Sequence, residues 1–146
     1  MTFSRFVLAG ITTLLIGVFA CASDGTAPNS GNGDGGGVPT LSEDVQPIIS
    51  SNCALSGCHA GASPAAGINL SDGQTHANTV NIPSNGSALD HIEPGQPDQS
   101  YLVHKIQGTQ TSVGGSGGRM PLGRAPLSEA QIDIVRAWIT GGALDN

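Results

Sequence analysis

The last 107 residues of the chain, 40–146, contain few large apolar side chains for a folded domain. Leucine, isoleucine and valine make up 22 of these 107 residues, close to the roughly 20% below which chains tend towards disorder. Tyr101 and Trp138 are the only aromatic residues of this segment, which also contains 14 glycines. A small domain already buries a low fraction of its surface. A flat apolar cofactor would fill the missing core, so the composition predicts one.

Four segments of this domain have the apolar spacing or the end signals of helices. We expect helices over 44–53, 72–79 and 98–107, and a last one from 128 to 141. The stretches between them are rich in glycine and turn residues, which predicts loops. The predicted fold class is therefore all-α, with helices near both ends of the domain joined by long glycine-rich loops.

The ends of these helices carry recognisable capping residues. Ser42 and Asp44 are the candidate N-caps of the first helix, and a cap at Asp44 places Pro47 in a first turn where its missing N–H removes no bond. Ser71 is the expected cap of the second helix, and Gly108 is the expected end of the third. These residues predict where each helix begins or ends.

The last helix has the clearest signals. Ser128 and Gln131 have the spacing of a capping box, and Gly141 is expected to end the helix. An apolar stripe follows at helical spacing, formed by Ile132, Val135, Trp138 and Ile139. We expect this stripe to face the core.

The first twenty residues are typical of a secretory signal peptide. Arg5 is followed by an apolar run to Ala20 that is short for a membrane span and ends in small residues. The run "VFAC" resembles a bacterial lipobox, which predicts lipidation of Cys21 and a membrane-anchored lipoprotein. The alternative is cleavage after Ala22, which would release a soluble periplasmic protein. The odd number of cysteines, three, favours lipidation of Cys21.

Residues 21–39 are predicted to be a flexible tether between this signal and the domain. Six glycines and two prolines lie between positions 23 and 39, with Val38 as the one aliphatic residue larger than alanine. Such a segment buries too little apolar surface to offset the entropy of ordering. The chain is thus divided into residues 1–20, 21–39 and 40–146.

Residues 40–146 carry four basic and nine acidic residues, a net charge of −5. A nucleic-acid partner is disfavoured, because no basic stripe is present to neutralise phosphates. The acidity is compatible with basic partner surfaces, or with solubility alone.

The stretch "CALSGCH" holds the residues with the most specific chemistry, Cys53, Cys58 and His59. A disulfide between the two cysteines suits an exported chain but leaves His59 unexplained. A zinc site would need a fourth ligand from elsewhere, such as His76, His91 or His104. A covalent haem explains all three residues, since two thiols bind the haem vinyl groups and an adjacent histidine binds the iron.

The usual haem-attachment pattern is C-x-x-C-H, whereas four residues separate the cysteines here. The turn at Ser56-Gly57 can accommodate the two extra residues, because glycine has no Cβ to clash. With this expanded C-x4-C-H site the chain resembles a bacterial single-haem cytochrome c domain. The resemblance covers most of 43–142, from "DVQPIISSNCALSGCHAG" through "PGQPDQSYLVHKIQG" and "RMPLG" to "LSEAQIDIVRAWITGGA".

This resemblance implies the fold and the cofactor set. The family has a small all-α fold in which the N- and C-terminal helices cross and loops surround one covalent haem c per chain. It also implies His59 as one axial iron ligand and a methionine, in a loop before the last helix, as the other. Met120 in "GRMPLG" matches that position, and the alternatives for the sixth ligand are His76, His91 and His104.

The function implied is one-electron transfer, in the periplasm or at a membrane surface, between redox proteins that the sequence does not identify. The expected protein is thus an electron carrier and not an enzyme, with a thioether ligand that favours reduced iron. One alternative is a haem sensor or small peroxidase-like protein with an open sixth position. Another is a non-haem binding module, closed by a disulfide, on a lipid anchor.

Overall fold

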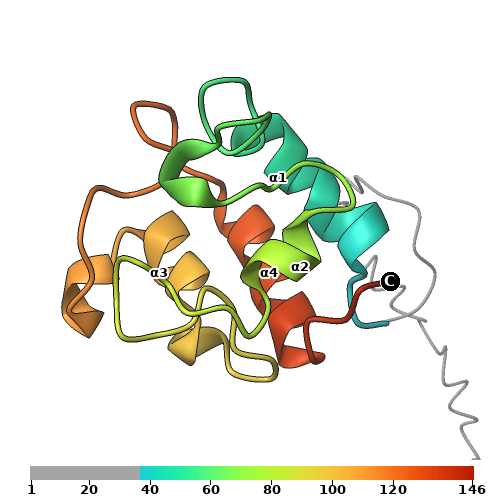
Figure 1. Cartoon of the computed structure of the whole chain (residues 1–146). Helices are drawn as coiled ribbons and strands as arrows, with labels where there is room; N and C mark the ends of the chain where they lie inside the picture. Colours follow the sequence, from blue (N-terminus) through green and yellow to red (C-terminus); the bar gives the residue numbers. More distant parts are fainter. Residues whose placement is uncertain (1–36) are drawn as a thin grey trace, which may run out of the picture. The chain divides into compact units, whose positions relative to one another are not determined.

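The computed structural model describes residues 37–146, which form four α-helices linked by loops and short helical turns (Figure 1). The helices are α1 (Gln46–Asn52), α2 (Thr75–Thr79), α3 (Tyr101–Gln107) and α4 (Glu129–Thr140). Within residues 37–146 there is no β-strand, so the predicted all-α class is confirmed. The predicted signal peptide, Cys21 and most of the predicted tether lie outside the described residues.

The N-terminal helical segment begins earlier than predicted. A wide helical turn, η1 (Leu41–Val45), leads directly into α1, and its N-cap is Thr40, whose hydroxyl accepts a hydrogen bond from the Glu43 N–H. The prediction of Asp44 as the cap was wrong, because the Asp44 carboxylate accepts instead from the Thr40 N–H at 2.7 Å. Pro47 lies in the first turn of α1, as expected.

The second and third helices are shorter than predicted. No side chain caps α2, whose preceding residue is Gln74, so the expected cap at Ser71 was wrong. A separate helical turn, η3 (Pro97–Gln99), precedes α3, and extended Ser100 lies between them. The Ser100 hydroxyl accepts from the Glu93 N–H and donates to the Gln96 carbonyl, both at 2.9 Å, which stabilises this break. Gly108 ends α3 with a φ of 80°, as predicted.

The last helix matches its prediction. Ser128 and Gln131 form the capping box, and Gly141 follows the final residue, Thr140. Every member of the predicted stripe is buried, and Trp138 and Ile139 are at most 1% exposed. The Trp138 indole N–H donates to the Leu144 carbonyl at 2.9 Å, so burial leaves this donor satisfied.

The core joins α4 to the other elements. In Figure 1 α4 passes between α3 and the segment that holds α1, and its residues contact α3 and η1. The buried apolar cluster contains Leu41, Val45, Ile48, Ile49, Leu70, Ile92, Val103, Ile106, Leu127, Ile132, Val135, Trp138, Ile139 and Ala143. None of the helices between residues 37 and 146 has the length and apolarity that a membrane span requires.

Candidate functional site

A cavity of about 480 Å³ opens between α1, α3, α4 and the loops that connect them. Its volume lies within the range of small-molecule and cofactor sites. The apolar part of its wall includes Ile48, Ile49, Ile68, Leu70, Leu102, Ile106, Leu127 and Val135. The predicted site residues Cys53, Cys58, His59 and Met120 all line this cavity. The structure thus brings together residues that lie up to 67 positions apart in the sequence.

The two cysteines and the histidine are positioned by a closed turn at the end of α1. The Cys53 N–H donates to the Ile49 carbonyl at 2.7 Å, which continues the helical pattern for one more residue. The His59 N–H then donates back to the Cys53 carbonyl at 3.1 Å. Gly57 has a φ of 79°, and no atom outside its neighbours lies within 4 Å of a Cβ placed there. Glycine is needed here for its backbone conformation, because the space itself is open.

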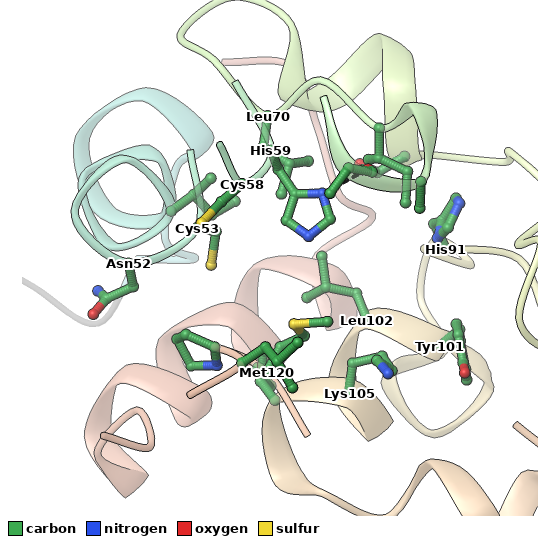
Figure 2. A pocket seen from close by; sticks show the side chains of 18 of the residues that line it. Asn52, Cys53, Cys58, His59, Leu70, His91, Tyr101, Leu102, Lys105 and Met120 are labelled. Carbon is green, nitrogen blue, oxygen red and sulfur yellow. Dashed lines mark hydrogen bonds between the residues drawn. The ribbon is translucent and has the colours of Figure 1, made fainter. Parts of the chain in front are cut away.

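Both thiols are half-buried, and Cys53 and Cys58 are not joined by a disulfide. Burial, with a smaller contribution from Cys58, raises the pKa of Cys53 to about 11. Cys53 is therefore an uncharged thiol at neutral pH, which suits the apolar wall around it. Figure 2 shows both sulfurs on the same side of the cavity.

The ring of His59 is oriented by a backbone carbonyl. Its Nδ1 lies 3.1 Å from the Ala65 oxygen, and because a carbonyl can only accept, Nδ1 carries the proton. The other ring nitrogen, Nε2, then has a free lone pair, and Figure 2 shows it directed into the cavity. The Ala65 N–H donates to the Cys58 carbonyl at 2.7 Å, so the orienting residue is itself held by the cysteine turn. This is the arrangement of a histidine prepared to bind a metal.

Met120 lies on the other side of the cavity from His59 (Figure 2). Its side chain is half-buried, and its N–H donates to the Lys105 carbonyl on α3 at 2.8 Å. Pro121, which follows, is buried. The thioether therefore faces the same space as the His59 Nε2.

The other three histidines are placed differently. His91 is 9% exposed and lines the cavity, whereas His76 and His104 do not line it. The His104 ring contacts the Thr109 hydroxyl at 2.9 Å and the Asp98 carbonyl at 3.1 Å. Burial lowers the pKa of His91, while the nearby Asp90 carboxylate raises it less. Of the three alternative ligands from the sequence, the cavity wall includes His91 alone.

Sequence reasoning missed several polar residues of the wall, among them Tyr101 and Lys105. Both lie on α3 and line the cavity, and Figure 2 shows them, with His91, on the side opposite the cysteines. Tyr101 is 5% exposed although it has a hydroxyl. The four-residue spacing places both on one face of α3, and that spacing was the available signal. The cavity is therefore lined by many apolar side chains, with a group of polar residues at this end and Asn52 on the side of the cysteines.

Charge is distributed unevenly over the domain. Residues 46–71, which include the cysteine turn, have no charged side chain. Residues 99–128, which include Met120, carry Lys105, Arg119 and Arg124 and no acidic residue. All nine acidic residues of 40–146 lie outside these two segments, and one of them, Asp98, forms an ion pair with Arg136 at 2.8 Å. Neither of these two segments, 46–71 and 99–128, therefore contributes to the negative net charge of the domain.

In the described residues 37–146, no three His, Cys, Asp or Glu side chains are grouped so that they could hold a metal ion by themselves. The comparisons with known proteins add no assignment, since no protein family, curated protein or solved structure matches the chain.

Proposed function

We propose that this protein is a one-electron carrier with one covalently bound c-type haem, ligated by His59 and Met120. The observation that carries the proposal is the state of His59. Its protonated Nδ1 is bonded to the Ala65 carbonyl, and its free Nε2 faces a cavity lined by two thiols and by one thioether. A c-type haem with His and Met ligation would use these groups, because two thiols would attach the ring and the imidazole and the thioether would bind the iron.

The wall of the cavity also fits a haem in its polarity. A haem has an apolar ring with vinyl groups along one edge and two propionate groups along another. The cysteines lie on one side of an apolar cavity, and the polar residues His91, Tyr101 and Lys105 lie on the opposite side. An ammonium group at that end would favour carboxylates. The wall is therefore matched to a ligand that is apolar at one edge and anionic at the other.

The residues have separate roles in the proposed mechanism. Cys53 and Cys58 would hold the haem covalently, each thiol adding to one vinyl group so that a carbon–sulfur bond forms and the thiol hydrogen is retained on the other vinyl carbon. His59 and Met120 would ligate the iron in both redox states, which would keep structural change on electron transfer small. The apolar wall excludes water, and the thioether sulfur favours the reduced state. A haem bound here supplies a metal centre that gains or loses one electron.

The fold supports a cytochrome c-like arrangement. Helix α4 contacts the N-terminal turn η1 and the helix α3 on which Met120 is held. The loops between these helices carry the proposed iron ligands. We extend the proposal to export, on the basis of residues 1–20, and to attachment at a membrane through a lipid on Cys21, with other redox proteins as donor and acceptor.

The test is the intact mass and the absorption spectrum of protein exported from a host that attaches haem in its periplasm. We expect the mass of the mature chain plus one haem, and a reduced spectrum of the c type. A colourless protein that is two hydrogens lighter, with Cys53 joined to Cys58, would instead identify the disulfide-closed binding module.

The sixth ligand needs its own comparison. Met120→Ala should remove the spectral signature of His/Met coordination in the oxidised protein, whereas His76→Ala and His104→Ala should leave it unchanged, since neither side chain lines the cavity. An unchanged spectrum in Met120→Ala would favour the sensor or peroxidase-like protein with an open sixth position. Loss of the signature in His91→Ala alone would assign His91 as the ligand.

A further inference from the structure

The loop that leads to Met120 has a composition that does not favour order. Residues 108–119, "GTQTSVGGSGGR", contain five glycines. Fixing the backbone of one residue costs about 1–2 kcal/mol, and glycine loses more conformational freedom than other residues. The Met120 thioether nevertheless faces the cavity at the end of this loop. Bonds within the loop, such as that from the Gln110 Nε2 to the Gly117 carbonyl at 2.9 Å, and contacts from outside it together offset the entropy of holding it there.

Lys105 contacts the loop at Met120 itself and at two residues that precede it. Its ammonium Nζ donates to the Gly118 carbonyl at 2.5 Å and to the Ser116 carbonyl at 3.2 Å. Its backbone carbonyl accepts from the Met120 N–H at 2.8 Å. One residue of α3 is thus bonded to the loop at three points within five positions.

A second residue of α3 holds the same part of the loop. The Tyr101 hydroxyl donates to the Ser116 carbonyl at 2.9 Å and accepts from the Ser116 N–H at 3.1 Å. The Tyr101 ring lies so close to Gly86 and Gly115 that a Cβ on either would come within 3 Å of it. The Lys105 Nζ lies 5.8 Å from the centroid of this ring. Tyr101 therefore fixes the middle of the loop, and Lys105 fixes its last residues before Met120.

We propose that Lys105 is a positioning residue, whose ammonium group holds residues 116–118 so that the Met120 sulfur stays in the cavity as an iron ligand. This inference rests on the proposed function for the role of the sulfur. A lysine is suited to the task because its ammonium group has three donors and no acceptor, and charge-assisted bonds to carbonyls are stronger than neutral ones. Without the ammonium, the Gly118 carbonyl loses its side-chain partner, the Ser116 carbonyl keeps only the Tyr101 hydroxyl, and the loop loses its last fixed point before Met120.

The first measurement does not depend on haem. Hydrogen–deuterium exchange of the exported protein, as purified, reports the opening of residues 114–120. In Lys105→Met we expect these amides to exchange about tenfold faster or more, since two hydrogen bonds to a charged group are lost. Gln107→Met is the matched control, because Gln107 is exposed on the same helix, and its exchange should equal that of the unchanged protein. Equal exchange in Lys105→Met and in this control would overturn the inference.

The second measurement follows the sulfur itself. In the haem-loaded protein, Lys105→Met should weaken the His/Met signature and speed the binding of added imidazole at the sixth position about tenfold. Lys105→Arg keeps the charge and the hydrogen-bond donors. Its His/Met spectral signature and its rate of imidazole binding should therefore be close to those of the unchanged protein. If Lys105→Met does not fold, Lys105→Gln, which keeps one amide donor group, should give intermediate values of exchange and of imidazole binding.

The outcomes separate the two proposals. A colourless protein in which Lys105→Met still speeds exchange of 114–120 would refute the haem proposal and keep Lys105 as the residue that orders this loop. A haem protein whose signature and imidazole binding are the same in Lys105→Met and Gln107→Met would keep the haem and remove the positioning role of Lys105.

Discussion

The two sides of the cavity are built in different ways. On the cysteine side, residues 53–59 close on themselves through bonds such as that from the His59 N–H to the Cys53 carbonyl. On the methionine side, residues 108–120 are held partly by bonds within the loop, such as that from the Gly115 N–H to the Gln110 carbonyl, and partly by side chains of α3, with Lys105 thirteen positions before its partner Gly118. A short closed turn loses little entropy on ordering, whereas a longer loop loses more and needs partners from elsewhere. The same cavity thus depends on local chain geometry on one side and on long-range contacts on the other.

The largest effect should come from removing the cysteine side. The double substitution Cys53→Ser and Cys58→Ser removes both proposed attachment points, and a domain so poor in large apolar residues should lose most of its helical structure together with the proposed haem. Circular dichroism and intact mass of the exported protein measure both. A double variant that keeps its helicity would show that the cavity side built by α3 and α4 is stable without a covalent cofactor.

The methionine side should respond less strongly. Tyr101→Phe keeps the buried ring and removes the two hydrogen bonds to Ser116, so we expect a loss of about 2 kcal/mol in the free energy of unfolding. Urea denaturation followed by Trp138 fluorescence gives this value. No change in stability would mean that the loop is held by Lys105 without help from Tyr101.

A matched pair of glycines compares the two sides directly. Gly57 and Gly123 have φ angles of 79° and 69°, and neither would meet a neighbour with an added Cβ. Alanine at either position should therefore destabilise the fold by about 1 kcal/mol through backbone strain alone. Only Gly57→Ala should also lower the yield of attached haem, because only Gly57 lies between the two cysteines. Equal haem yields, measured by absorbance per protein mass, would contradict a special role for the cysteine turn.

The smallest effect should be a dependence on pH at the polar end. Burial lowers the pKa of His91 in the folded state below its ordinary value. The unfolded chain therefore binds the proton more readily, so this contribution to stability is complete above about pH 6.5 and is lost as the pH falls below it. The free energy of unfolding, measured by denaturation at pH 7.5 and at pH 5, should differ less between the two pH values in His91→Phe than in the unchanged protein.

His76→Asn is the control for this pH series, because His76 is half-buried but does not line the cavity. The free energy of unfolding of His76→Asn should differ between the two pH values by as much as that of the unchanged protein. If both variants behave alike, the acid sensitivity of the domain has a source other than the cavity wall.

The sequence predicted the elements that are defined by neighbouring residues. The capping box at Ser128, the end of α3 at Gly108 and the buried stripe of α4 all depend on spacings of a few residues. The start of the first helix was misplaced, because Thr40 and Asp44 are both good caps and their mutual hydrogen bond decides between them. Such a choice depends on geometry that a residue pattern does not contain.

The site residues also divide into those that the sequence identifies and those that only the three-dimensional packing identifies. Cys53, Cys58 and His59 form a recognisable pattern, and Met120 was found through a family resemblance. The functions of Tyr101 and Lys105 could not be predicted, because their partners are backbone atoms of a loop without a sequence signature. His91 was named as one of several histidines, and its burial follows from the packing of distant segments.

The uneven distribution of charge around the cavity has a physical consequence for encounters with other molecules. Positive side chains in 99–128 and carboxylates elsewhere give the domain a dipole moment in addition to its negative net charge. A charged surface exerts a torque on such a dipole and turns it before contact, over distances of about one Debye length. The domain therefore turns its positive segment toward a negatively charged partner and its carboxylates toward a positively charged one, and added salt weakens this preference.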